Sequence, residues 1–209
     1  MKKLLILGDD IAYGYKKSFA EHLGDGYSVI FKEIPIHSKH NDCLEGEICV
    51  DSGELLSCVE SEYKDKCPDC DIIIFNCGLQ DIKYNWMEEK IQIEKQQYED
   101  NLIQICDILK NTGASVYFVN STPIYDEVHN SMGNIIKNGE IVRRPHDLEE
   151  YNKIAQRVVL KNGIPVIDLY SFTKAMGISA VRDHIHYHEK YENQQGKYIA
   201  DYIINKNKD

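Results

Sequence analysis

Residues 3–10 of the chain read Lys3-Leu4-Leu5-Ile6-Leu7-Gly8-Asp9-Asp10, and they indicate the class of fold. Their apolar run is short and continuous, and a glycine ends it. Such a run is typical of a strand that is buried on both faces, as in a parallel sheet. Reactive groups of parallel sheets lie in the loops beyond the carboxyl ends of the strands. Residues 3–10 therefore predict a buried first strand that presents Asp9 and Asp10 to a functional site.

Downstream of this strand, helical and strand patterns alternate. Ile11, Tyr15, Phe19 and Leu23 recur at helical spacing, and Ile72-Ile73-Ile74-Phe75 is the least ambiguous later strand. Alternation of this kind predicts a three-layer α/β/α sandwich around a mostly parallel five-stranded sheet, a flavodoxin-like arrangement. The predicted strands are 3–7, 27–35, 71–77, 115–120 and 164–169, and the predicted helices are 11–23, 53–63, 89–110, 148–161 and 190–205.

Length and charge limit the classes of function. The 209 residues suit a single domain over residues 1–209. The 24 basic and 34 acidic side chains give a formal charge of −10 with no basic stripe, so we expect neither a nucleic-acid partner nor an anionic membrane surface. The short N-terminal apolar run does not resemble a secretory signal, and we expect a cytoplasmic protein.

The seven cysteines fit this reducing context, because an odd number leaves at least one thiol unpaired. Cys67 and Cys70 form a Cys-x-x-Cys pair, but the segment leads into a strand rather than opening a helix, and no second close pair follows it. We therefore interpret these cysteines as structural thiols.

One connection is unusually long. Over twenty residues separate Pro123 from the next predicted helix, and within them Asn138-Gly139 stands between apolar flanks in residues 135–142, a hairpin signal. Long loops in compact domains usually carry a lid or a binding loop. The sequence predicts a flap or insertion at about residues 124–146.

Polar segments mark the ends of the predicted strands. They are Gly8-Asp9-Asp10, then Asp51-Ser52-Gly53 opening a helix, then Gly78-Leu79-Gln80-Asp81, and finally Asp183-His184-Ile185-His186 before the last helix. In order and spacing the chain resembles the SGNH (GDSL) hydrolase family, and the resemblance covers nearly its whole length. Members of that family carry Gly-Asp-Ser after the first strand, a glycine in a loop opening a helix, Gly-x-Asn-Asp after the third strand and Asp-x-x-His before the last helix.

The resemblance assigns roles residue by residue. His186 matches the base, Asp183 matches the acid that orients it, and Gly53 matches the glycine of the oxyanion hole. Two positions depart from the family: Asp10 stands where the nucleophilic serine would be, and Gln80 stands where the oxyanion-hole asparagine would be. Gln80 keeps the amide donor on a side chain that is one methylene longer.

What the resemblance implies is a carboxylic-ester hydrolase acting on small acetyl or short acyl esters, including those of carbohydrates. A small-molecule ester or carbohydrate is the expected ligand, and no cofactor or metal is implied. Because the nucleophile position is substituted, the activity is expected to be altered or reduced.

Asp10 leaves several chemistries open. A carboxylate that attacks an acyl carbon gives a high-energy anhydride, whereas attack on an alkyl carbon suits halides and epoxides. Asp10 could instead act as a general base on water. His186 would lie near Asp10 and Asp183, which both favour its cation and raise its pKa. An inert Asp10–His186 salt bridge in a silent, ligand-binding protein is the first alternative, and an aspartate introduced into a serine enzyme is another.

Other polar residues suggest further alternatives. His184, His186 and His188 alternate and would face one way in an extended segment, which suggests a metal-dependent hydrolase as a second alternative. In the family this region turns into a loop and helix, so we favour surface positions for His184 and His188. Ser52 is a weak candidate for a replacement nucleophile. Asp9 and Asp81 are interpreted as supports of the loops, and Arg143, Arg144 and His146 as surface residues or contacts for an anionic substrate.

Overall fold

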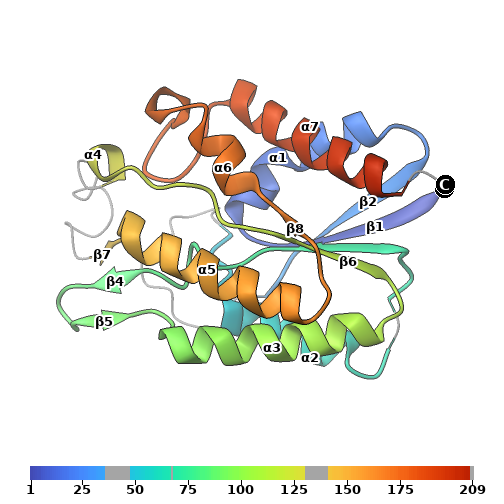
Figure 1. Cartoon of the computed structure of the whole chain (residues 1–209), viewed down its shortest axis with the longest axis horizontal. Helices are drawn as coiled ribbons and strands as arrows, with labels where there is room; N and C mark the ends of the chain where they lie inside the picture. The colour runs from blue at the N-terminus through green and yellow to red at the C-terminus, as the bar shows by residue number, and fades with distance from the viewer. Residues whose placement is uncertain (36–47, 67, 130–140, 208–209) are drawn as a thin grey trace.

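A five-stranded parallel sheet forms the centre of the molecule (Figure 1). The computed structural model describes residues 1–35, 48–66, 68–129 and 141–207. Strand order is β2-β1-β3-β6-β8, and every pairing is parallel, which confirms the predicted α/β fold. The strands are β1 Lys2–Leu7, β2 Tyr27–Lys32, β3 Ile72–Phe75, β6 Ser115–Val119 and β8 Val166–Ile167.

Helices cover both faces of this sheet (Figure 1). One layer contains α1 (Asp10–Leu23), α6 (Leu169–Lys174) and α7 (Glu189–Lys206), and the other contains α2 (Ser52–Tyr63), α3 (Lys95–Asn111) and α5 (Pro145–Lys161). Helices α1 and α7 pack so closely that a Cβ on Gly196 would lie 2.6 Å from the backbone nitrogen of Phe19. Glycine at this position is therefore required for the two helices to approach one another.

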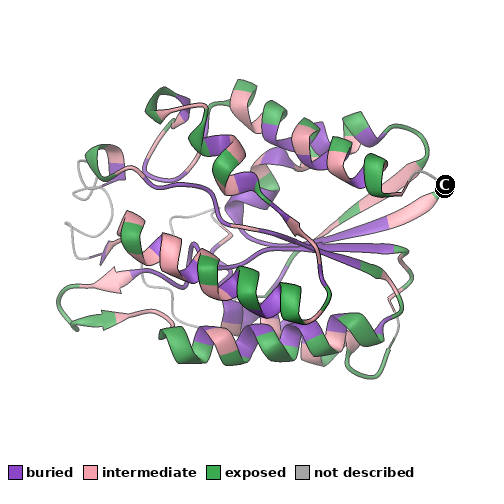
Figure 2. Ribbon diagram, viewed as in Figure 1, coloured by how far each residue is buried: buried purple, intermediate pink, exposed green. Residues whose placement is uncertain are grey.

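Burial follows the layers. Figure 2 shows the central strands as buried and the outer faces of the helices as exposed. All four residues of β3 and the last four of β1 are buried, as their continuous apolar runs predict. The sheet is thus the rigid base from which the polar loops project.

The strand order places a topological switch between β1 and β3. From β1 the chain adds β2 on one side of the sheet and β3 on the other. In open α/β sheets, ligands bind beyond the carboxyl ends of the strands at such a point. Leu7 pairs with Phe75, and the Asn76 N–H donates to the Leu7 carbonyl at 3.0 Å. Residues 8–10 and 76–80 therefore leave the sheet side by side.

A second, small sheet corrects the prediction of a helix over residues 89–110. It consists of β4 (Tyr84–Asn85), β5 (Lys90–Ile91) and β7 (Ile141–Val142), and α3 begins only at Lys95. The Asn85 side chain accepts from the backbone N–H groups of Met87 and Glu88, and Glu89 has a positive φ of 49°. These features close a turn between β4 and β5 and keep residues 84–91 out of the helix.

The predicted flap at residues 124–146 is described only in part. Residues 130–140, and with them most of the predicted 135–142 hairpin, lie outside the described residues. Before them the chain forms the short helix α4 (Asp126–His129), and after them β7 pairs antiparallel with β4. The C-terminal side of the flap is therefore attached to the small sheet.

The remaining elements differ from the prediction mainly at their ends. The predicted helix 148–161 begins earlier, at Pro145, which occupies its first turn. The predicted strand 164–169 shortens to β8 because Asp168 caps α6 by accepting from the Ser171 N–H. A 3-10 turn at Ile178–Ala180 precedes the last helix. Among the described residues, no helix has both the length and the apolarity needed to span a bilayer.

Candidate active site at the carboxyl ends of β1 and β3

Asp9 and Asp10 begin helix α1 directly after β1. Asp9 is the N-cap, and its Oδ1 accepts from the Ile11 N–H at 3.1 Å and from Asn76 Nδ2 at 3.0 Å. Burial raises the pKa of Asp9. Asp10 is the first residue of the helix and is buried, with its carboxylate at the helix N-terminus, where negative charge is favoured. Asp9 therefore supports the loop, as predicted, and Asp10 is the group presented to the site.

Asp183 and His186 lie on a tight loop before α7. Val181 bridges to Tyr187 and closes the loop, and Asp183 Oδ1 accepts from the backbone N–H groups of Ile185 at 3.1 Å and His186 at 2.9 Å. The same carboxylate contacts His186 Nδ1 at 2.9 Å through Oδ1 and at 3.0 Å through Oδ2. Asp183 thus shapes the loop and orients the imidazole.

The charge of Asp183 is held by these contacts. Burial alone raises the pKa of this carboxyl, but the hydrogen bonds from the His186 side chain and backbone outweigh it and hold the pKa well below its usual range. An ionised carboxylate only accepts hydrogen bonds, so His186 Nδ1 carries a proton and the working nitrogen is Nε2. The pair has the geometry of an acid that orients a catalytic histidine.

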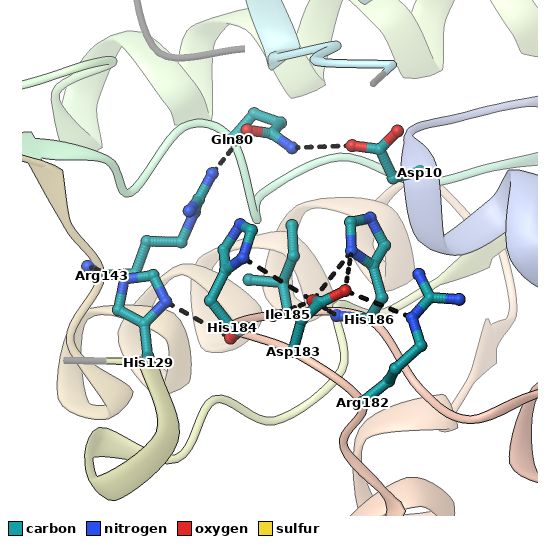
Figure 3. A network of polar contacts seen from close by, with 9 residues as sticks. All are labelled: Asp10, Gln80, His129, Arg143, Arg182, Asp183, His184, Ile185 and His186. Carbon is teal, nitrogen blue, oxygen red and sulfur yellow. Dashed lines mark hydrogen bonds and ion pairs between the residues drawn. The ribbon is translucent and has the colours of Figure 1, made fainter. Parts of the chain in front are cut away.

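Asp10 and His186 face one another from opposite sides of the site. Figure 3 shows the His186 ring pointing toward Asp10, with Gln80 beside Asp10. Gln80 Nε2 donates to Asp10 Oδ2 at 3.5 Å, and the Ile48 N–H donates to Asp10 Oδ1. The structure therefore brings the predicted nucleophile position, base, acid and amide together.

The two predicted oxyanion donors have different surroundings. Gln80 is fully buried, and its Nε2 carries two hydrogens, so one remains for a second acceptor beside Asp10. The Gly53 N–H, by contrast, donates to Asp51 Oδ1 at 2.9 Å as part of the N-cap of α2. Gly53 can serve an oxyanion only by sharing this hydrogen with Asp51.

Ser52 and Asp81 connect α2 to the loop after β3. The Ser52 side chain is fully buried and its Oγ accepts from Asn101 Nδ2 at 2.9 Å, while its N–H donates to Asp81 Oδ1 at 2.9 Å. Burial, together with the nearby Asp51 charge, raises the pKa of Asp81 to about 7. Both residues are structural supports, and the contact of the Ser52 hydroxyl with Asn101 on α3, rather than with a histidine, argues against Ser52 as a nucleophile.

The alternating histidines do not share one face. His184 is buried, His188 is exposed at the start of α7, and the rings of His184 and His186 stand edge to face with centroids 5.8 Å apart. The surface position predicted for His188 is confirmed, and that for His184 is wrong. In the part of the chain that the structure describes, no three His, Cys, Asp or Glu side chains gather as metal ligands would.

The structure bears on the cysteine prediction at several positions. Cys49 is disulfide-bonded, which differs from the expectation of reduced thiols, whereas Cys58, Cys70, Cys77 and Cys106 are free. Cys67 lies outside the described residues. Cys70 is a free thiol whose pKa is raised to about 11 by burial and then by Asp71 and Asp69. A thiol of this kind is a poor nucleophile at neutral pH, which agrees with a structural interpretation.

Two residues that the motifs did not single out complete the network in Figure 3. Arg143 follows β7 and is 3 % exposed, so its predicted surface position is wrong. Its guanidinium donates to Gln80 Oε1 at 2.7 Å and to the Leu79 carbonyl at 2.8 Å. His129, at the end of α4, accepts from the Arg143 N–H through Nε2 at 2.9 Å, and its Nδ1 contacts the His184 carbonyl at 3.3 Å.

His129 is held as a neutral imidazole. Nε2 accepts a hydrogen bond and Nδ1 donates one, so the ring has a single tautomer and no place for a second proton. Burial, followed by the Arg143 and His184 charges, lowers the pKa of His129 to about 3. The unfolded chain binds this proton near pH 6.5, so stability from His129 falls as the pH drops below 6.5.

We predict that His129→Gln changes how stability depends on pH. Between pH 7 and pH 5, protonation of His129 in the unfolded chain lowers the free energy of unfolding of the wild type by about 2 kcal/mol. Glutamine does not titrate in this range, so the variant does not show this decrease. Urea unfolding at both pH values should show a variant that is less stable at pH 7 and approaches the wild type at pH 5. The control is His146→Gln, at a side chain that is 76 % exposed. If the difference in unfolding free energy between the wild type and His129→Gln is the same at both pH values, His129 is not held neutral in the folded protein.

One cavity lies elsewhere, between α5 and β8. It measures about 310 Å³ and its polar lining includes Asn120, Glu149, Asp168 and Tyr170. None of the residues predicted for the site lines this cavity; they cluster at the carboxyl ends of β1 and β3.

Solved structures share this architecture. An acetyl xylan esterase, AlAXEase, matches with a TM-score of 0.70 at 15 % identity, over 97 % of this chain and 100 % of its own. A lipase/acylhydrolase from Enterococcus faecalis matches with a TM-score of 0.71 at 16 % identity, over 99 % and 97 %. A GDSL-like lipase from Bacteroides thetaiotaomicron matches with a TM-score of 0.66 at 15 % identity, over 98 % and 89 %.

No protein-family model and no curated protein sequence matches the chain. At 15–16 % identity, the structural likeness establishes that this chain has the SGNH hydrolase fold. It does not establish the chemistry, which depends on the residues at the site.

Proposed function

We propose that the protein hydrolyses small acetyl or short acyl esters, with water rather than Asp10 as the nucleophile. The observation that carries this proposal is the assembled Asp183–His186 pair, whose imidazole points at the substituted nucleophile position. The acetyl xylan esterase among the structural neighbours supports an acetyl group as the first acyl group to test. Acetylated carbohydrates are accordingly the first substrate class to test.

Asp10 acts as the general base in this proposal. Attack of its carboxylate on an acyl carbon would form an anhydride, whereas removal of a proton from water avoids that intermediate. The water oxygen attacks the carbonyl carbon, its proton passes to Asp10, and the carbonyl oxygen becomes an oxyanion. One hydrogen of Gln80 Nε2 lies on the Asp10 side, and its second hydrogen serves the oxyanion.

His186 acts as the general acid. Asp10 and Asp183 stand on either side of its ring, and both favour the imidazolium. When the tetrahedral intermediate collapses, the bond from the carbonyl carbon to the alcohol oxygen breaks and Nε2–H protonates the leaving alkoxide. The proton on Asp10 then returns to His186, so ester and water become acid and alcohol with no net change in the protein.

The same contacts account for a slow reaction. Asp10 accepts from the Gln80 amide, and the Gly53 N–H is engaged by Asp51, so the donors that stabilise an oxyanion are already partly satisfied. Loss of one such donor typically costs about 10²–10³-fold in kcat. We therefore expect turnover well below that of a serine enzyme.

A second candidate function is ligand binding without turnover. The observation that favours it is again Asp10, whose negative carboxylate accepts from Gln80 and Ile48 in the way that a substrate oxyanion would. In that case an Asp10–His186 ion pair fills the site, and an ester or carbohydrate binds next to it unchanged.

Hydrolysis in oxygen-18 water tests for turnover and for an Asp10 anhydride that opens at the aspartyl carbonyl. We expect acetate release from an acetyl ester by the wild type, with the label in the acetate and none in the peptide that contains Asp10. Label in the Asp10 carboxylate would show that Asp10 itself attacks the substrate. Acetate release no faster than in buffer, together with saturable binding of the ester, would favour the silent protein.

A further inference from the structure

Arg143 is a buried cation that the proposed reaction does not use. It follows β7, which is paired with β4, so the small sheet carries it into the site. Its Nη2 donates to Gln80 Oε1 at 2.7 Å and its Nε to the Leu79 carbonyl at 2.8 Å. Burial of a charged side chain costs free energy unless the charge is hydrogen-bonded, so these two hydrogen bonds hold the guanidinium in this position.

The guanidinium determines which way the Gln80 amide faces. Arg143 can only donate hydrogen bonds, so the oxygen of the amide must face Arg143 and the NH₂ group must face Asp10. A rotation of the amide by 180° would place donors against donors at Arg143. Hydrogen bonds from a cation are about twice as strong as neutral ones, so the observed orientation is strongly favoured.

The same contact strengthens Gln80 as a donor. The positive guanidinium beside Oε1 withdraws electron density from the amide, and hydrogen bonds in a chain polarise one another. Gln80 is fully buried, so water does not screen this effect. The longer glutamine side chain is thereby held in one position at the site.

His129 fixes Arg143 in turn. Its Nε2 accepts from the backbone N–H of Arg143 at 2.9 Å. Its Nδ1 donates to the carbonyl of His184, in the loop that carries the Asp183–His186 pair. Figure 3 shows this sequence of contacts running from that loop through His129 and Arg143 to Gln80 and Asp10. Hydrogen bonds therefore connect the loop that carries His186 to the Gln80 amide, which faces Asp10.

We propose that Arg143, anchored by His129, is a positioning residue that orients and polarises the Gln80 amide to stabilise the oxyanion. The inference rests on the proposed ester hydrolysis and extends it from the strand-end residues to the small sheet. Arg143 does not touch the substrate in this account. Its effect on turnover therefore passes entirely through Gln80.

A double-mutant cycle tests this dependence. We expect Arg143→Met to lower kcat for an acetyl ester by about 10- to 100-fold with KM changed less than about twofold, because one oxyanion donor is impaired. Gln80→Leu should lower kcat further, and the double variant should equal Gln80→Leu alone. Losses that multiply in the double variant, or a change confined to KM, would contradict the proposal.

Two further variants separate positioning from folding. Arg143→Lys keeps the charge but cannot span both acceptors, so an intermediate loss of kcat is expected. Arg144→Met is the matched control, because the Arg144 guanidinium lies over the Tyr84 ring, 4.4 Å from its centroid, and forms an ion pair with Asp147 at 4.0 Å. It should keep its kcat. An effect of Arg144→Met equal to that of Arg143→Met would indicate a merely structural role.

A measurement that needs no turnover distinguishes failure of this inference from failure of the proposed function. In NMR spectra of ¹⁵N-labelled protein, the side-chain amide of buried Gln80 should exchange slowly in the wild type and in Arg144→Met. Arg143→Lys and Arg143→Met should shift the resonance and accelerate the exchange. An unchanged Gln80 resonance in both Arg143 variants overturns the proposal, whether or not the wild type hydrolyses esters.

Discussion

Asp10→Ser is expected to raise the rate of acetyl-ester hydrolysis by about 100-fold or more over the wild type. The substitution places a hydroxyl beside His186, whose ring already points toward residue 10 and is oriented by Asp183. Serine attack gives an acyl ester instead of an anhydride and removes the negative charge next to the Gln80 amide. In a serine enzyme, loss of the nucleophile costs about 10⁶-fold in kcat, so partial recovery of this factor is a large gain.

Covalent labelling provides the second measurement for this variant. A phosphonate ester probe should label Asp10→Ser at residue 10 and leave the wild type unlabelled, because only an activated serine reacts with it. Asp10→Ala is the control, since it removes the carboxylate without adding a nucleophile. Equal rates for Asp10→Ser and Asp10→Ala would show that the Asp183–His186 pair cannot activate a hydroxyl at this position.

Asp183→Asn in the Asp10→Ser background is expected to lower kcat by about 10³–10⁴-fold. Asparagine can still accept from the N–H groups of Ile185 and His186, so the loop is retained, but its amide favours the wrong tautomer of His186. The comparable substitution in a serine protease costs about 10⁴-fold. Measurement of kcat and the melting temperature separates the chemical effect from unfolding.

Arg182→Gln is the control for that variant. Arg182 is more than half exposed and donates to the outer oxygen of Asp183 at 3.3 Å. Its loss removes a solvent-screened contact but leaves both contacts to His186 Nδ1, so kcat should change only a few-fold. A loss from Arg182→Gln as large as that from Asp183→Asn would mean that the charge of Asp183 acts other than through His186.

The main sheet could be predicted because its signals are local. β1 and β3 are continuous apolar runs ended by polar residues, and both were expected within one or two residues of their observed bounds. Helix α1 likewise follows from apolar spacing. The motifs at the strand ends then predicted which residues meet, because parallel strands bring their carboxyl ends to one edge.

The small sheet could not be predicted because its pairing is not local. β4 and β7 have two residues each and pair across more than fifty residues of chain, so neither carries a recognisable pattern. This pairing decides that Arg143 enters the site while Arg144 stays outside it. From the sequence alone the two arginines are equivalent, and the role of His129 depends on the same pairing.

Comparison of the wild type with His186→Ala on an acetyl ester tests whether the Asp183–His186 pair supports ester hydrolysis. Folded samples of both proteins are assayed at the same concentration, and their acetate release is compared with the release in buffer alone. The proposed reaction predicts that the wild type releases acetate faster than buffer and that His186→Ala loses this excess, by about 10²-fold or more, as expected for the loss of general acid–base catalysis. Equal rates for the wild type and His186→Ala would contradict it and leave the site as one that binds without turnover.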